Sequence, residues 1–431
     1  MKLLFLVLVG IALVSAAVFS GPTLVLIILV STLVYFALRG LYRAMDLNKD
    51  GKVNFDDLRH LLGAQDESPA IPATPEDRER EARSFMDRRL HGIWQALEEE
   101  FVLLSVSIQA REKQASRGWR RMFSDRSARD VTRIVEMLAR ELEDPILAER
   151  QDDFLSATRL LTQKRNQLAE IEASMSMSFG GTASASKLRT KESTESKIRQ
   201  IEARRQTTVG LFATRLECYG LKLSSEQAEV LLSRIDSSDV GQMTAVFALI
   251  ARLTAKLAAA KAGSSENLDV TRKYYGIYLG LLELQLFLQA KYIDSVNDNY
   301  LPGVDALTDD AKQLLATTRA KLKASHKDHE VGYESNIKAQ QFTINVSEVY
   351  ASTLRNDRAK VMEAKKLVTK QHELAENTLS TVRVSADLSS LIQQGEQMYA
   401  QVMDLQTPAL VPFENLQMQR EFEALTSRLR A

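Results

Sequence analysis

Residues 85–108 read FMDRRLHGIWQALEEEFVLLSVSI, and their pattern indicates the fold class of most of the chain. Large apolar side chains recur mainly at spacings of three and four residues, which places them along one face of an α-helix. These side chains are Phe85, Ile93, Trp94, Leu97, Phe101, Leu104 and Ile108. No proline lies between Pro75 and Pro145, so we expect one long helix over residues 76–116.

The same pattern extends toward the C-terminus, where prolines are scarce and strong helix formers dominate. It predicts helices over residues 76–116, 130–142, 145–174, 188–219, 225–235, 240–262, 267–299, 305–327 and 332–405. The apolar positions do not keep a strict heptad, so a parallel zipper is disfavoured. We therefore expect residues 78–405 to form a mostly α-helical, elongated antiparallel bundle with coiled-coil sections and a mobile loop near 174–187.

Composition limits the classes of function. The 431 residues include 56 basic and 56 acidic side chains, so no global basic excess favours nucleic acid as a partner. The single cysteine, Cys218, excludes an intrachain disulfide. It has no nearby histidine in the sequence, so we expect a packed or idle thiol rather than a nucleophile.

An uncharged segment near the N-terminus predicts a membrane anchor. Residues 3–38 carry no charge and are too many for one ordinary crossing. The sequence Ser20-Gly21-Pro22-Thr23 interrupts them, so we expect two short spans, 3–19 and 23–38, that form a transmembrane hairpin within residues 1–45. A cleaved signal peptide at the first span, or one kinked span, remains an alternative.

The basic residues that flank this segment predict its orientation. Lys2 precedes it, and Arg39, Arg43, Lys49 and Lys52 follow it. The positive-inside bias then places both ends of the hairpin in the cytoplasm. We expect an integral protein of the inner or plasma membrane with a cytoplasmic body and the lipid bilayer as one partner.

Directly after the second span, residues 46–57 read DLNKDGKVNFDD. Oxygen-bearing residues alternate along this stretch, and Gly51 lies at its centre, where a sharp turn needs a glycine. Calcium binds six to eight oxygen ligands, which such alternation can direct toward one point. An alternative reading is a polar turn that caps a following helix over residues 56–62.

The stretch resembles the EF-hand calcium loop, and it is more similar to the loops of dockerin-type modules than to calmodulin sites. The resemblance covers residues 46–57 only, with an exit helix expected up to residue 62, and it implies calcium as a cofactor. It implies as metal ligands the side chains of Asp46, Asn48, Asp50 and Asp57 and the backbone carbonyl of Lys52. Asp57 stands where EF-hands usually have glutamate, and its shorter side chain reaches the ion less easily.

A linker and a tail flank the predicted bundle. Residues 63–77 contain three prolines and predict a semi-extended linker. In the tail, residues 406–431, an extended apolar segment precedes a short amphipathic helix. The helix is marked by Phe413, Leu416, Phe422, Leu425 and Leu429. It either docks on the bundle or binds a partner.

No recognised catalytic motif occurs, so we expect a protein without enzymatic activity. The pair His326 and His329 is interpreted as solvent-facing rather than metal-binding. A basic cluster is interpreted as a solvated surface, with anionic lipid or nucleic acid as the alternative; it comprises Arg111, Lys113, Arg117, Trp119, Arg120, Arg121 and Arg126.

These features favour a membrane-anchored, non-enzymatic scaffold or signalling component that presents a coiled-coil body to protein partners not identifiable from sequence. Two other hypotheses remain open. One is a sensor or transducer in which calcium reorients the second span. The other is a membrane-remodelling or envelope-stress protein that polymerises through its long helices, and a homo-oligomer is compatible with both.

Overall fold

The computed structural model describes residues 75–116, 124–176, 185–262, 268–324, 330–381 and 385–430. All of them belong to one unit of the chain, Ser68–Ala431. The predicted transmembrane hairpin (1–45), the calcium-type loop with its exit helix (46–62) and most of the linker (63–77) lie outside the described residues. So does most of the loop predicted near 174–187.

Helices make up nearly all of the described residues, and no strand occurs among them, which confirms the mostly α-helical prediction. In chain order they are α4 (Pro75–Ser116), α5 (Ser124–Leu142), α6 (Pro145–Ser176), α7 (Ala185–Cys218), α8 (Ser225–Leu232), α9 (Ser237–Ala262), α10 (Leu268–Ser295), the π-helical turn η1 (Val296–Tyr300), α11 (Leu301–Ala324), α12 (Glu330–Thr381), α13 (Ser385–Gln406) and α14 (Leu416–Leu429).

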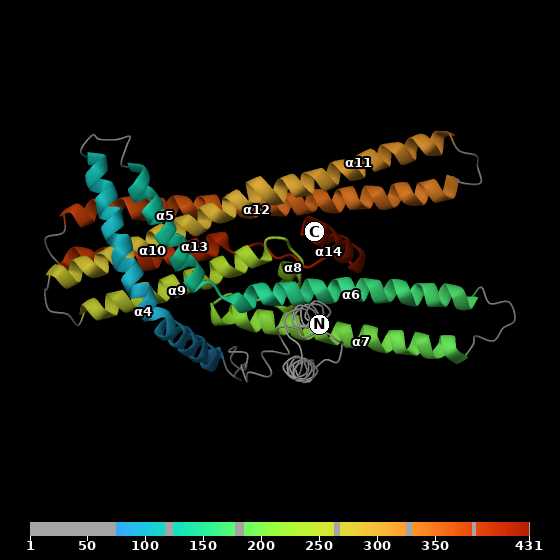
Figure 1. The fold of residues 1–431 in the computed structure, drawn as a ribbon, viewed down its shortest axis with the longest axis horizontal. Helices are drawn as coiled ribbons and strands as arrows, with labels where there is room; N and C mark the ends of the chain where they lie inside the picture. The colour runs from blue at the N-terminus through green and yellow to red at the C-terminus, as the bar shows by residue number, and fades with distance from the viewer. Residues whose placement is uncertain are drawn as a thin grey trace, which may run out of the picture. The chain divides into compact units, whose positions relative to one another are not determined.

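Two long helical hairpins stand out in this bundle (Figure 1). Helices α6 and α7 pack side by side along one hairpin, and α11 and α12 pack along the other. The remaining core contains α4, α5, α9, α10 and α13. Short α14 packs against α12, α11 and α6, so it contacts both hairpins. The two hairpins are therefore joined through the core and through the C-terminal helix.

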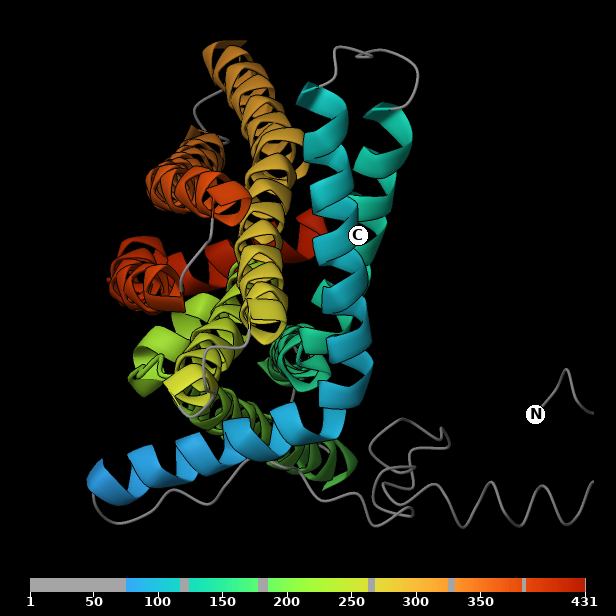
Figure 2. The same cartoon turned by 90° about the vertical axis from the view of Figure 1, so that its left-hand side faces the viewer.

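Helix α10 crosses α4 at a close approach, and the two lie side by side in Figure 2. Gly276 faces Ser105, and a Cβ atom added at Gly276 would lie 2.6 Å from the Ser105 Cβ. One turn later, a Cβ at Gly280 would lie 3.1 Å from Phe101 and 3.0 Å from Leu104. These two glycines, four residues apart on one helix face, let the backbones approach.

Helix α9 is the most apolar of the core. Among the described residues, Ser237–Ala259 is the one stretch long and apolar enough to cross a membrane, and 67% of its most apolar window is buried. The neighbours that bury it include α10 and α13. Packing in the helical core therefore accounts for its hydrophobicity.

The predicted break between residues 299 and 305 is wrong. Ser295 and Leu301, on either side of η1, both have α-helical backbone angles, so α10, η1 and α11 form one continuous helix. The physical reason is Pro302, whose ring would clash with the carbonyl of residue 298 in a regular α-helix. The wider π turn accommodates the proline without ending the helix.

A single helix over residues 332–405 is also wrong, because α12 and α13 pack against each other. Gln371 of α12 donates a hydrogen bond of 3.3 Å to the carbonyl of Leu391 in α13, so the chain reverses between them. Burial of Ile392, Tyr399 and Val402 accompanies this reversal. No glycine or proline lies between the helices to announce it.

Candidate functional site

The joint between α5 and α6 is built around Asp144, whose side chain is fully buried. Proline disfavours the α conformation in the residue before it, so Pro145 ends α5 ahead of Asp144 and opens α6. Asp144 then caps α6, because its Oδ1 accepts a hydrogen bond of 3.1 Å from the backbone N–H of Ile146. The sharp corner between the two helices therefore follows from the Asp-Pro pair.

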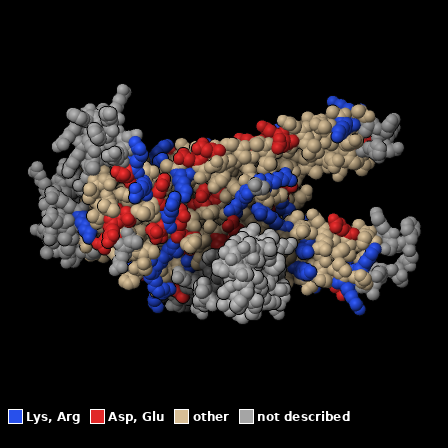
Figure 3. All heavy atoms as spheres, viewed as in Figure 1, with Lys and Arg blue, Asp and Glu red and all other residues tan. Residues whose placement is uncertain are grey.

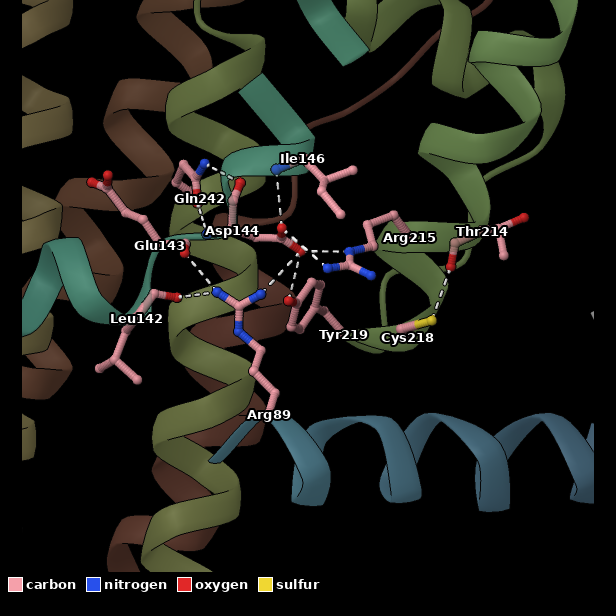
Figure 4. Close-up of polar contacts among 10 residues, drawn as sticks. All are labelled: Arg89, Leu142, Glu143, Asp144, Ile146, Thr214, Arg215, Cys218, Tyr219 and Gln242. Carbon is pink, nitrogen blue, oxygen red and sulfur yellow. Dashed lines mark hydrogen bonds and ion pairs between the residues drawn. The ribbon is translucent and has the colours of Figure 1, made fainter. Parts of the chain in front are cut away.

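The C-terminal end of α7 and the turn that follows it supply two partners of this carboxylate (Figure 4). Arg215 donates from Nε to Oδ2 at 2.5 Å and from Nη2 to Oδ1 at 3.2 Å, which is the bidentate geometry of a strong ion pair. The hydroxyl of Tyr219 donates to Oδ2 at 2.7 Å. Arg215 lies in the last turn of α7, and Tyr219 comes directly after the helix ends at Cys218.

Two further helices complete the cluster, which we call the Asp144 cluster: Asp144, Arg89, Arg215, Tyr219 and Gln242. Arg89 of α4 lies 3.5 Å from Asp144 Oδ2 and donates to the carbonyls of Leu142 and Glu143 at 3.2 and 2.6 Å. The amide of Gln242 in α9 bonds both the backbone N–H and the carbonyl of Asp144, each at 2.7 Å. The cluster thus ties α4, α7 and α9 to one corner of the chain.

The electrostatics of the cluster oppose proton transfer. Burial acts to raise the pKa of Asp144, but the hydrogen bonds and charge of Arg215, with the charge of Arg89, outweigh it and lower the pKa. Burial and the neighbouring carboxylate raise the pKa of Tyr219. Asp144 therefore stays ionised and Tyr219 stays protonated near neutral pH. The arrangement suits a structural clasp rather than an acid–base catalyst.

Cys218 lies beside this cluster and is buried. Its Sγ donates a hydrogen bond of 3.3 Å to the carbonyl of Thr214. Burial raises the pKa of the thiol to about 11, despite the nearby Arg215. A thiol that holds its proton is a poor nucleophile, which agrees with the packed thiol predicted from sequence.

A second buried group surrounds the turn between α8 and α9, and we call it the Arg234 cluster: Arg234, Asp236, Asp357, Tyr292 and Tyr350. Arg234 donates to both carboxylate oxygens of Asp236, at 2.8 and 2.6 Å, and to Asp357 of α12 at 2.7 Å. Tyr292 of α10 donates to Asp236 at 3.0 Å. The hydroxyl of Tyr350 accepts from the Ile235 N–H at 2.6 Å.

The two carboxylates here share one guanidinium, so its single positive charge cannot balance both negative charges. Burial raises the pKa of Asp357; the charge and hydrogen bond of Arg234 act against this, and the negative charge of Asp236 adds to it. The pKa of Arg234 rises because the two carboxylates outweigh its own desolvation. The cluster binds α12 to the start of α9.

The π turn η1 is held on two sides and borders an open pocket. Tyr300 donates to Asp239 of α9 at 2.7 Å, and Arg358 of α12 hydrogen-bonds to Asn297. The pocket has a volume of about 490 Å³ and lies between α5, α10 and η1; its lining includes Glu136, Arg140, Glu143, Phe287, Lys291, Asp294, Ser295, Asp298 and Asn299. Both signs of charge line it.

Among the described residues, no group of three or more His, Cys, Asp or Glu side chains is placed to hold a metal ion.

The residues predicted from sequence to form a site are not among those brought together here. The expected calcium ligands Asp46, Asn48, Asp50, Lys52 and Asp57 lie outside the described residues. The same holds for the pair His326 and His329 and for the side chains of the basic cluster around residues 111–126. The calcium site and the basic surface therefore stay predictions.

Sequence reasoning missed both buried clusters, although weak signals were present. Asp144-Pro145 is a typical helix-start pair, and the spacing of Arg215 and Tyr219 would place two polar side chains on one face of the predicted helix. Neither signal identifies its partner in the fold, since Asp144 and Arg215 are 71 residues apart. In the other cluster, Arg234 and Asp357 are 123 residues apart. Pairings at this separation are set by tertiary packing.

Comparison with known proteins adds no relative to this description: no protein-family model, curated protein or solved structure matches the chain.

Proposed function

We propose that the chain is a membrane-anchored, non-enzymatic helical scaffold or signalling component whose body presents long helices to protein partners in the cytoplasm. The observation that carries this proposal is the exposure of the outer parts of both hairpins. No described side chain is buried in residues 162–176 and 186–193 of α6–α7, or in residues 319–324 and 330–343 of α11–α12. Helices with so few buried side chains leave most of their surface free to contact other molecules.

Apolar side chains on these outer parts supply candidate contacts. Leu188 on α7 is 45% exposed, and Val331 on α12 is 77% exposed. Charged side chains of both signs are interspersed over the visible face, and no single-sign field covers it (Figure 3). Such mixed surfaces favour protein partners over nucleic acid, which a strongly basic face would attract.

The hairpin surfaces are tested by Leu188→Glu and Val331→Glu in the full-length chain, with Met362→Glu as the matched control. Met362 is 44% exposed on α12 and lies outside the outer part of the hairpin. Each change sits on the surface, so stability should shift by less than about 0.5 kcal/mol. The size of the detergent-extracted complex should fall for the two hairpin variants and not for the control. A wild-type chain that sediments alone would remove the proposal.

The anchor is supported by the uncharged residues 3–38 and by the basic residues that flank them. A reporter fused after Ala431 should be active only on the cytoplasmic side, and the chain should resist extraction by carbonate. Release by carbonate would contradict the anchor. Activity on the opposite side would contradict the orientation and favour a single kinked span.

The calcium-type loop gives the second candidate function, a calcium-responsive transducer. What favours it is position: Asp46 follows the end of the uncharged segment by only eight residues, so an ion bound there would stiffen the exit from the membrane. Isothermal titration of the full-length chain should show calcium binding that is lost in an Asp46→Ala, Asp50→Ala double variant. No difference between the two proteins would end the transducer hypothesis and leave the scaffold standing.

A further inference from the structure

The C-terminal helix α14 occupies a seat formed by parts of the chain that are distant in sequence. The ring of Phe422 stacks on Tyr350 of α12, with centroids 4.0 Å apart and planes 18° apart. Phe413 packs edge-on against Phe422 at 5.2 Å. Leu425 is almost completely buried. The docking that was one of two expectations for the tail is therefore present.

Polar contacts specify the seat more closely. Glu423 forms an ion pair with Arg205 of α7. Thr426 donates to the carbonyl of Ser233 at 2.5 Å and shares a hydrogen bond of 2.8 Å with the hydroxyl of Tyr350. Because Arg205 and Tyr350 belong to different hairpins, α14 bridges the two. The seat is complementary to this helix in both shape and charge.

The connection to the seat is short, and its middle is exposed between the buried Leu410 and the packed ring of Phe413. Between α13 and α14 the chain is not helical from Thr407 to Asn415, and Val411 in its middle is 73% exposed. Pro412 follows and has no N–H to donate. Asn415 caps α14 with a hydrogen bond of 2.8 Å from the Met418 N–H, so the helix begins with its own cap and does not depend on α13.

The seat holds α14 through few buried groups, which are Phe422, Glu423, Leu425 and Thr426. Burial raises the pKa of Glu423 even though Arg205 opposes the shift, so the carboxylate is incompletely compensated in place. Elements with few buried contacts open locally at a lower free energy than the whole fold. Such local opening would release α14 from its seat while the bundle stays folded.

We propose that the seat also receives α14 from a second copy of the chain, so that copies are linked by reciprocal exchange of their C-terminal helices. A second copy is the occupant that fits, because its α14 reproduces every contact already made within one chain. Exchange of an identical element costs only the ordering of two chains and any change in the hinge. The exposed hinge at residues 411–412 is the segment that must reorient. This inference concerns self-association and does not depend on the anchor or on calcium.

The test exchanges charge between the tail and its seat in full-length chains kept in detergent. Glu423→Lys places a lysine against Arg205, and Arg205→Glu places a third carboxylate beside Glu229 and Glu423; Arg205 and Glu229 are 2.7 Å apart in the native protein. Within each single variant, residues 205 and 423 carry charges of the same sign. When the two variants exchange their C-terminal helices, both seats receive a tail of opposite charge. Mixed, differently tagged variants should yield about tenfold more heterodimer than two tagged wild-type chains.

The control is the double variant Arg205→Glu, Glu423→Lys, which restores the match within one chain and should behave like the wild type. Circular dichroism checks that each single variant keeps its helices. Folded single variants that give no more heterodimer than the wild type would overturn the proposal and leave α14 as a fixed brace. If either variant fails to fold, deletion of Val411 and Pro412 replaces it. A chain with this shortened hinge and an otherwise wild-type sequence should form dimers instead of monomers. If it stays monomeric, the proposal is overturned.

Discussion

Two buried charge clusters hold the described helices together, and they are built with opposite ratios of acid to base. The Asp144 cluster places one carboxylate between two guanidinium groups, those of Arg89 and Arg215. The Arg234 cluster places one guanidinium between two carboxylates, those of Asp236 and Asp357. The first therefore carries a formal excess of one positive charge and the second an excess of one negative charge. Buried charges are costly unless paired, so the minority member of each cluster matters most.

This difference in charge balance shifts the pKa values of the buried carboxylates in opposite directions. In the Asp144 cluster the pKa of the carboxylate is lowered, because the arginines outweigh its burial. In the Arg234 cluster the pKa of Asp357 is raised, because burial and the charge of Asp236 outweigh the opposing effects of Arg234 and Lys360. The carboxylate of the Asp144 cluster is thus fully compensated at neutral pH, whereas protonation of Asp357 would relieve the excess negative charge of the Arg234 cluster. Four predictions break or sharpen this contrast, in order of decreasing effect.

The largest effect is expected from Arg234→Met. It removes the guanidinium that pairs with both buried carboxylates, so the free energy of unfolding should fall by about 5 kcal/mol. Chemical denaturation of the full-length chain in detergent, followed by circular dichroism, measures the change. The control is Arg355→Met, whose ion pair with Asp305 is exposed and should contribute less than about 1 kcal/mol. Equal losses in the two variants would show that the Arg234 cluster is not a focus of stability.

Asp144→Asn should cost less, about 3 kcal/mol, because the amide keeps the shape and one acceptor oxygen while losing the charge that pairs Arg215 and Arg89. The pH dependence gives a second readout. A lowered pKa means that Asp144 contributes stability above its unfolded-state pKa, and this contribution is lost as the pH falls through the folded-state value. The wild type should therefore lose stability in acid in a step that Asp144→Asn lacks. A variant with the same acid step would assign that step to other carboxylates.

The third prediction concerns the packing of α4, which carries Arg89 of the Asp144 cluster, against α10. Gly276→Ala would push α4 away from α10 at Ser105 and should destabilise the chain by about 2 kcal/mol. Gly92, on α4, has open space around its Cα. Gly92→Ala should instead stabilise the chain, by about 0.5–1 kcal/mol, because alanine favours the helix.

A double-mutant cycle links this packing to the cluster. If α4 must be seated for Arg89 to reach Asp144, then Gly276→Ala and Arg89→Met together should cost less than the sum of the two single changes. Strict additivity would mean that the glycine contact and the charge cluster act independently. The same cycle with Gly92→Ala in place of Gly276→Ala should be additive.

The two clusters also mark the limit of what sequence predicts in this protein. Helical periodicity in residues such as Phe101 and Leu104 predicted the fold class and most helix positions, because that signal is local. It failed at Pro302, where a π turn absorbs a proline, and between α12 and α13, where tertiary burial reverses the chain without a glycine or proline. The clusters themselves could not be predicted, since Asp144 and Arg215 are 71 residues apart and nothing local pairs them.

The smallest effect, and the only one of opposite sign in the charge clusters, is expected from Asp357→Asn. The amide still accepts a hydrogen bond from Arg234 and removes the excess negative charge, so the chain should gain up to about 1 kcal/mol at neutral pH. A raised folded-state pKa means that the native state takes up a proton before the unfolded state does as the pH falls. Asp357 therefore adds stability on acidification, from its raised pKa down toward its unfolded-state value near 3.8.

The Asp357→Asn variant lacks the group that adds stability on acidification, so its advantage over the wild type should disappear as the pH falls. Both proteins should still lose stability at lower pH, in the step assigned to Asp144. Unfolding curves for the wild type and Asp357→Asn, measured at a series of pH values, should therefore converge as the pH falls toward 4. A constant offset between the two curves would mean that Asp357 is not the group that titrates. A destabilised variant at neutral pH would mean that Arg234 needs both carboxylates, and the contrast between the two clusters would then reduce to geometry rather than charge balance.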